Sequence, residues 1–394
     1  MTGAVPPPAV SPALAAVQRC RERFDRDPND ERARAALADA LFAYAHELRQ
    51  GGRLAAAVAA FAQAAKFAPG NAAAWVAFGN ACMELELASE RAAQPPLPGE
   101  DLLAHALDAF SRASTLRPDD SLIAAHCAMA ARYACAWTRA ERAEGELDRL
   151  ARERPADFAC EPGAAVAMLA DARVQRLGIG GWCRKLLPTP AAPPVVRRRG
   201  TRLRLGYLSS DLHDHATAHL AAGLFEQHDR ARFEVFAYAS DADDGSAMRA
   251  RLRRAFDHWR DVAGAGDAEA ARTIADDGVD VLIDLKGHTN GARAGILARR
   301  PAPLQLHYLG FPGTLAWGAI DGTIVDDVVA PPGSDAACRP ATGRPERRGA
   351  ALLVRAPDPA RPRHGAEGLR AEAAGPSRAG AAELRPAPAD PLPA

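Results

Sequence analysis

The sequence lacks the marks of several protein classes. Its seven cysteines form no C-x-x-C pair, so neither a zinc ribbon nor a disulfide framework is indicated. Acidic and basic residues balance at 49 each, and no net charge favours nucleic acid or an anionic membrane. The longest uncharged apolar stretch, residues 67–83, is interrupted by Pro69, Gly70 and Asn71, whereas a membrane span needs about 20 apolar residues. We therefore expect a cytoplasmic protein with no nucleic-acid or membrane partner.

Residues 13–186 are rich in alanine and follow a helical period, after a flexible lead over residues 1–12. The segment RLAAAVAAFAQAAKFAPGNAAAWVAFGNACMELE carries Phe61, Ala64 and Pro69, and the same offsets recur at Phe110, Ala113 and Pro118. These marks resemble the tetratricopeptide repeat, whose paired helices stack into a solenoid. The resemblance implies a protein or peptide partner along the repeats. An unrelated alanine-rich helical bundle is the alternative.

A change of composition follows the helical region. Residues 187–200, which include PTPAAPPVVRRRG, are typical of a linker. Residues 201–333 then alternate the apolar runs RLRLGYLSS, FEVFAYAS, VDVLIDLKG, PLQLHYLGF and the weaker TIVDDVV with the helical patterns TAHLAAGLFEQHD, SAMRARLRRAFDHW, DAEAARTIADDG and GARAGILARR. This alternation predicts a Rossmann-like lobe with a parallel sheet. The first turn has SSDLHDH in place of G-x-G-x-x-G, which argues against a dinucleotide-dependent oxidoreductase.

Polar loops follow the predicted strands and should meet at one edge of the sheet, where ligands bind in such folds. They are SSDLHDHATAH, SDADDGS, KGHTNGAR and LGFPGT. His215 and His219 are four residues apart and could share a zinc ion if a helix begins near Thr217. No cysteine or carboxylate stands nearby as a recognisable third ligand, so we expect no metal.

These loops, in their order and spacing, resemble the amino-terminal half of the catalytic region of the protein O-GlcNAc transferase family, including its bacterial SPINDLY-like members. The resemblance covers roughly 130 residues, and a tetratricopeptide region suits the same family. It implies a two-lobed GT-B fold that transfers N-acetylglucosamine from UDP-GlcNAc to Ser or Thr hydroxyls of proteins, with inversion and without a metal ion or other cofactor. Ala216 stands where the family usually has proline.

The resemblance also implies site residues. His215 matches the histidine of the family's D-x-x-x-H loop, which is proposed to act as a base or to position sugar and acceptor. Asp243 and Asp244 match the D-D-G loop, which is implicated in proton handling. The remaining predicted contacts, on the sugar and acceptor side, are Thr217, His219, Leu309, Gly310 and Pro312.

Simpler roles are open for several of these residues. His213 and His219 suit surface or helix-cap positions, and the two aspartates before Gly245 suit a turn and a helix cap. Lys286 and His288 could simply end a strand, and we leave them outside the predicted site.

The last segment, residues 334–394, does not continue into the second, nucleotide-binding lobe that the resemblance implies. It contains ten prolines but no aromatic residue and no isoleucine, so we expect disorder. A frameshift near Asp335 is our hypothesis for its composition. Little turnover is then expected of this chain alone, and a non-catalytic repeat scaffold that binds proteins is the alternative function. The donor sugar stays open, since GDP-fucose is a second candidate.

Overall fold

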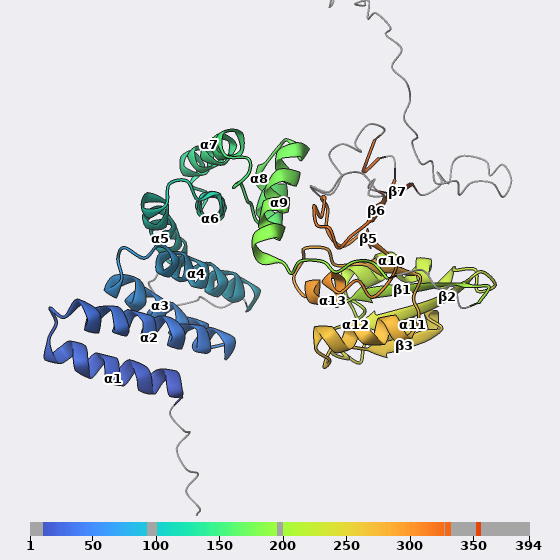
Figure 1. Ribbon diagram of the computed structural model, residues 1–394, viewed down its shortest axis with the longest axis horizontal. Coiled ribbons are helices and arrows are strands. Elements are labelled where there is room, and N and C mark those ends of the chain that lie inside the picture. Colours follow the sequence, from blue (N-terminus) through green and yellow to red (C-terminus); the bar gives the residue numbers. More distant parts are fainter. Residues whose placement is uncertain (1–10, 93–100, 195–199, 327, 332–351, 356–394) are drawn as a thin grey trace, which may run out of the picture. The chain divides into compact units, whose positions relative to one another are not determined.

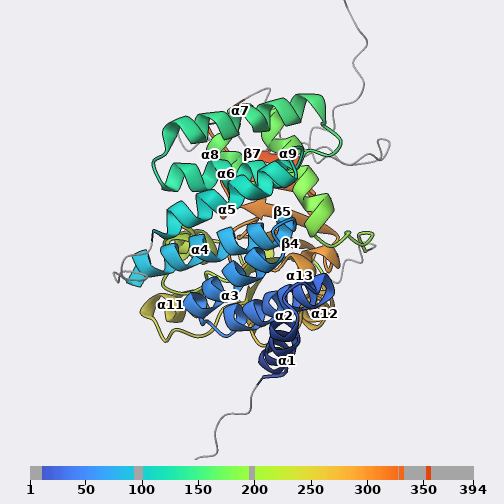
Figure 2. The same cartoon turned by 90° about the vertical axis from the view of Figure 1, so that its left-hand side faces the viewer.

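The part of the chain before the linker consists of helices that pack in order. The computed structural model describes residues 11–92, 101–194, 200–326, 328–331 and 352–355. Among these, the helices of the first part are α1 (Pro12–Arg26), α2 (Glu31–Gln50), α3 (Leu54–Phe67), α4 (Ala72–Ala92), α5 (Leu102–Leu116), α6 (Ser121–Tyr133), α7 (Trp137–Glu153), α8 (Pro162–Met168) and α9 (Ala172–Leu186). From α1 to α7, each helix packs against the next, side by side in Figures 1 and 2. The predicted helical repeat region is confirmed.

The repeated residues form the core between these helices. Phe61 and Phe110 are 0% and 1% exposed, at equivalent places in α3 and α5. The indole of Trp75 donates a hydrogen bond to the carbonyl of Pro69, in the turn before α4. Gly79 lies so close to α5 that a β-carbon there would stand 2.7 Å from the Phe110 ring. The small residues of the repeat therefore permit the close helix packing that the pattern predicted.

The helices α8 and α9 share a core with the following lobe. Ile179 and Cys183 of α9 belong to the same buried cluster as Leu315 and Trp317. The Cys183 thiol donates a long hydrogen bond of 3.6 Å to the Leu315 carbonyl. This end of the helical region is thus part of the packing of the lobe.

Within the described residues the lobe contains one parallel sheet. Its strands are β1 (Leu203–Ser209), β2 (Phe233–Ala239), β3 (His258–Asp261), β4 (Val281–Asp284), β5 (Leu304–Tyr308), β6 (Gly322–Val325) and β7 (Leu352–Arg355), in the order β3-β2-β1-β4-β5-β6-β7. All neighbouring pairs run parallel. The predicted Rossmann-like α/β lobe is therefore confirmed.

Helices lie against both faces of this sheet. The helices α10 (Ala216–Glu226) and α11 (Ala247–Ala255) bury their apolar residues with β1 and β2 on one face. The helices α12 (Asp267–Asp276) and α13 (Ala294–Ala298) join a second core with Leu282 and Phe236 on the other face. This arrangement is typical of a doubly wound sheet.

Two details differ from the sequence predictions. The helical pattern SAMRARLRRAFDHW ends as a helix at Ala255, and residues 258–261 form the edge strand β3, whose His258 pairs with Phe236. The predicted disordered tail lies mostly outside the described residues, but Leu352–Arg355 form β7 beside β6. Pairing with an edge strand explains both differences, because a ladder of backbone hydrogen bonds outweighs weak local preference.

The order of the strands creates a switch point between β1 and β4. The chain runs from β1 outward through β2 and β3, and then returns to place β4 on the other side of β1. In doubly wound sheets, ligands bind beyond the carboxyl ends of the strands at such a switch point. No helix of the described ranges is both long enough and apolar enough to cross a membrane.

Replacing Gly79 by alanine should destabilise the helical region by about 1–2 kcal/mol, because crowding of the Phe110 ring outweighs the higher helix propensity of alanine. Gly145→Ala is the matched control, since Gly145 lies within α7 with no atom within 4 Å of an added β-carbon. That change should raise stability by about 0.5–1 kcal/mol. Urea unfolding followed by circular dichroism measures both. Equal effects of the two changes would contradict the close approach.

Candidate functional site

A buried ion pair joins the two strands of the switch point. Asp211 follows β1 and Lys286 follows β4, and the Lys286 ammonium donates to both carboxylate oxygens at 2.7 Å. The two side chains are only 9% and 7% exposed. Because an unpaired charge is costly in such surroundings, each group holds the other in place. The pair therefore joins the loops after β1 and β4, and we call it the floor of the candidate site.

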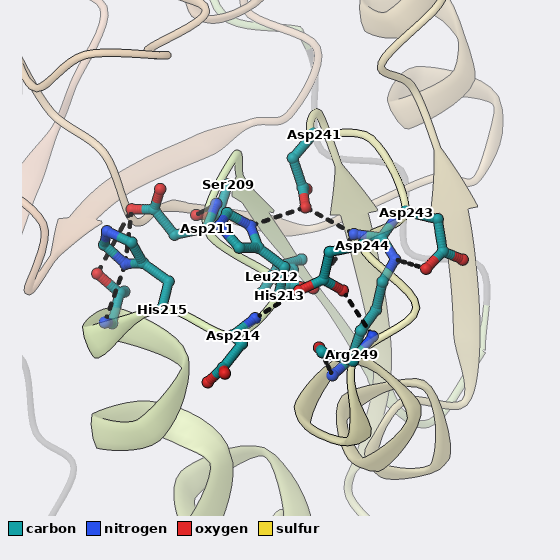
Figure 3. Close-up of polar contacts among 12 residues, drawn as sticks. Ser209, Asp211, Leu212, His213, Asp214, His215, Asp241, Asp243, Asp244 and Arg249 are labelled. Carbon is teal, nitrogen blue, oxygen red and sulfur yellow. Dashed lines mark hydrogen bonds and ion pairs between the residues drawn. The ribbon is translucent and has the colours of Figure 1, made fainter. Parts of the chain in front are cut away.

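His215 begins the helix that rises from this floor. It is the N-cap of α10, and its Nδ1 accepts the backbone N–H of Thr217 at 3.2 Å. The same nitrogen stands 3.6 Å from the Asp211 carboxylate (Figure 3). A nitrogen that accepts an N–H carries no proton, so the neutral ring has its proton on Nε2. The His215 side chain is 43% exposed and faces outward with a donor group.

Thr217 and His219 are placed differently. The Thr217 hydroxyl donates a long hydrogen bond, 3.4 Å, to Asp211 and so belongs to the floor. His219 lies one turn further along α10, where its Nε2 contacts the Asp214 carboxylate at 2.7 Å. Both members of that second pair are about 60% exposed, at 59% and 64%. The zinc alternative for His215 and His219 gains no support, since the described residues contain no group of three potential ligands.

Asp243 and Asp244 hold the loop after β2 in place through hydrogen bonds. Asp243 accepts the N–H of Gly245 and contacts Arg253 at 3.1 Å. Asp244 accepts two backbone N–H groups, from Asp214 and Ser246, each at 3.0 Å. These hydrogen bonds lower the pKa of Asp244 to about 2. A carboxylate held in this way is a weak proton acceptor, so the geometry favours a turn-holding role for Asp244, while the N-cap of α11 is Ser246.

The loop Leu309–Pro312 approaches the floor from the other side. Leu309 has a positive φ of 70° and is 39% exposed. A β-carbon on Gly310 would stand 1.9 Å from the carbonyl of Leu285 and 2.9 Å from the α-carbon of Lys286, so only glycine fits. Pro312 is exposed beyond this contact. The loop thus lies directly against the backbone of the residue that binds Asp211.

Sequence reasoning missed four supports of the site, the first of which is Lys286, the residue that it left outside the predicted site. Asp211 occupies the first position of the D-x-x-x-H loop, a signal that pointed to it. His307 is 1% exposed, and its Nε2 accepts the backbone N–H of Phe311. This hydrogen bond holds the loop that contains Gly310. Arg249 is 1% exposed and donates to Asp241, Asp261 and the Leu212 carbonyl. No local pattern marks Arg249, since arginines are common throughout its helix.

The comparisons with known proteins agree with the motifs. Residues 190–337 match the family model described as Glycosyl transferase family 41. A probable UDP-N-acetylglucosamine–peptide N-acetylglucosaminyltransferase of Arabidopsis thaliana, SEC, is 42% identical over 143 residues, which are 36% of this chain and 15% of that protein. A Caenorhabditis elegans UDP-N-acetylglucosamine–peptide N-acetylglucosaminyltransferase is 42% identical over 135 residues, which are 34% of this chain and 12% of that protein.

Two further similarities complete the comparison. A probable SPINDLY transferase of Petunia hybrida is 32% identical over 135 residues, covering 33% of this chain and 14% of that protein. The solved structure of a Thermobaculum terrenum O-GlcNAc transferase mutant is 29% identical with a TM-score of 0.49, over 77% of this chain and 56% of that one. The chain thus matches only 12% to 15% of the length of these curated relatives. Over the matched segment, the resemblance to the O-GlcNAc transferase family is confirmed.

Replacing Lys286 by methionine should destabilise the lobe by about 3–5 kcal/mol, because the Asp211 carboxylate is then buried without its partner. Adding Asp211→Asn should recover part of this loss, since no unpaired charge remains. His219→Ala is the control, because it breaks an exposed pair and should change stability by no more than about 0.5 kcal/mol. Denaturant unfolding measures all three variants. A Lys286→Met loss no larger than that of the control would show that the pair is not structural.

In an acid titration, the Asp244 carboxylate should stay ionised at pH values well below 3.8, which is the ordinary pKa of an aspartate side chain. Its folded-state pKa is lowered, so its stabilising effect is complete above the unfolded value and is lost as the pH falls through about 2. Carboxyl carbon NMR of the folded protein measures the midpoint directly. A midpoint near 3.8 would contradict the two backbone hydrogen bonds.

Proposed function

We propose that this chain, whose residues 190–337 match the family model described as Glycosyl transferase family 41, contributes one wall of a site for sugar transfer to proteins. The reaction is the inverting transfer of N-acetylglucosamine from UDP-GlcNAc to a Ser or Thr hydroxyl. The observation that carries the proposal is the Asp211–Lys286 pair at the switch point of the sheet. This pair holds the N-terminus of α10, where His215 is the N-cap, beside the switch point. Ligands bind at this position in doubly wound folds.

The geometry supports a specific role for His215. Its ring is fixed through Nδ1 and is partly exposed, so Nε2–H can donate to an oxygen of the sugar or of the acceptor. The adjacent N-terminus of α10 adds a positive partial charge, which favours the oxygen-rich ligand. His215 therefore positions the reacting groups.

The loop Leu309–Pro312 is the proposed opposite wall. The absence of a side chain at Gly310 lets the loop lie on Lys286, and the exposed Leu309 and Pro312 offer an apolar surface to one face of a sugar ring. Thr217 and His219 lie on the acceptor side. Protein acceptors are proposed to bind along the helices α1–α7, as the resemblance to tetratricopeptide repeats suggests.

The departing diphosphate needs compensation of its charge, which the resemblance assigns to cationic side chains and helix N-termini without a metal ion. We propose that these groups belong to the second, nucleotide-binding lobe that the resemblance implies, in a cytoplasmic setting. Low turnover of this polypeptide by itself stays a prediction. A radiolabelled UDP-GlcNAc assay on the purified chain checks it, and activity above that of His215→Ala would contradict it.

The site itself can be tested in a hybrid protein, in which residues 201–326 replace the matched segment of the Caenorhabditis elegans relative. The hybrid should transfer radiolabelled N-acetylglucosamine to a Ser- or Thr-containing peptide. His215→Ala should lower the rate by about a hundredfold or more, which is the usual contribution of a group that handles or orients the reacting proton. Arg251→Ala should leave the rate nearly unchanged, because it removes only an exposed ion pair with Glu226.

Circular dichroism establishes that each hybrid is folded before its rate is compared. A folded hybrid without transfer, under conditions where the parent relative is active, would contradict the proposed function. Retained peptide binding by such an inactive hybrid would favour the repeat scaffold. Equal rates for His215→Ala and Arg251→Ala would remove His215 from the site.

A further inference from the structure

The residue next to the switch point that the proposed function leaves unused is His213. We propose that His213 is the proton-accepting imidazole of the transfer site, and that Asp241 and Arg249 position it. This inference rests on the proposed function and divides the work of the site between two histidines. His213 comes from the loop after β1, and Asp241 comes from the loop after β2 (Figure 3).

The first support is the contact between His213 and Asp241. The Nδ1 of His213 lies 3.0 Å from Oδ2 of the carboxylate. The carboxylate is an acceptor only, so Nδ1 carries the proton and donates it. The proton on Nδ1 leaves Nε2 of the neutral ring with a free lone pair. Among the described residues, Nε2 of His213 has no hydrogen-bond partner, and the side chain is 28% exposed.

The second support is the buried arginine behind Asp241. The Arg249 side chain is 2% exposed, and its Nη1 donates to the same Oδ2 at 2.6 Å and to the Leu212 carbonyl at 3.3 Å. Its Nη2 donates to Asp261 at 2.9 Å. An arginine keeps its charge at all ordinary pH values, so the carboxylate beside it is held as an acceptor. Arg249 thus fixes both the backbone before His213 and the carboxylate that orients its ring.

The two neighbouring histidines therefore present opposite tautomers. Their ring centroids are 5.6 Å apart. His215 accepts at Nδ1 and presents Nε2–H, whereas His213 donates at Nδ1 and presents a bare Nε2. A base needs a free lone pair, and an orienting donor needs a proton. His213 suits the first task and His215 the second.

A surface role alone does not account for this arrangement. An exposed His–carboxylate pair contributes little to stability, as expected for His219 and Asp214. Asp241 is 10% exposed and Arg249 is 2% exposed, so the imidazole is held by a buried carboxylate that is itself paired with a buried arginine. A buried partner that binds the ring nitrogen opposite the reacting one is typical of a group that must keep one orientation.

In the proposed step one bond forms, one bond breaks and one proton moves. The hydroxyl oxygen of the Ser or Thr acceptor forms a bond to the anomeric carbon of the donor sugar. The bond from that carbon to the diphosphate oxygen breaks, and its electron pair leaves with the nucleoside diphosphate. The hydroxyl proton passes to Nε2 of His213, which becomes a cation beside Asp241.

The tautomers can be measured in the full-length chain without substrate. Nitrogen-15 NMR correlations within the imidazole rings should show His213 protonated at Nδ1 and His215 protonated at Nε2. Asp241→Ala should abolish the preference of His213, while Asp241→Asn should retain it, because an amide oxygen can replace Oδ2. Asp261→Ala is the matched control, since it removes another carboxylate from Arg249 without touching His213.

Reactivity of the same full-length chain tests the proton-accepting role. An unprotonated imidazole nitrogen attacks a carbonyl carbon of diethyl pyrocarbonate and becomes ethoxycarbonylated, and mass spectrometry locates the product. His213 should react faster than His215, and Asp241→Ala should remove this difference, whereas Asp261→Ala should not. A His213 protonated at Nε2, a faster reaction at His215, or identical results for the two alanine variants would overturn the inference. An inactive hybrid with these tautomers intact would contradict the proposed function instead.

Discussion

The buried ion pair between Asp211 and Lys286 is the interaction on which the rest of the site depends. It joins the end of β1 to the end of β4, where the winding of the sheet reverses. Burial makes each charge dependent on the other, so neither loop can move away without a large cost in free energy. The start of α10 and the loop at Gly310 are both built against this pair.

Arg249 acts in a similar way on the other side of the first loop. Its guanidinium carries several donors in a fixed plane, and they reach Leu212, Asp241 and Asp261 from one buried position. The loop that bears His213 and His215 is therefore held between two buried cations, Lys286 and Arg249. This rigidity permits two adjacent imidazoles to keep opposite tautomers, because each Nδ1 faces a different fixed partner.

Much of the architecture could be predicted from local pattern. The helical repeats, the strands β1, β2, β4 and β5 and the convergence of their loops all followed from periodicity and from the sequence of motifs. The edge strands β3 and β7 did not, because their short segments are stabilised by the neighbouring strand more than by their own residues. Within the site, a helix start near Thr217 was considered from the sequence, but the helix cap was expected at His213 or His219 and is His215. The holding role of Asp244 depends on the distant N–H of Asp214.

The sequence by itself determined the kinds of elements, their order and the family resemblance of the lobe, because these depend on residue types at short and regular spacings. The tertiary structure alone decided which charges meet and which imidazole nitrogen carries a proton. Asp211 and Lys286 are 75 positions apart, and Asp241 reaches His213 from another loop. Such pairs follow from strand order and register, which bring distant side chains together in a way that no local pattern encodes.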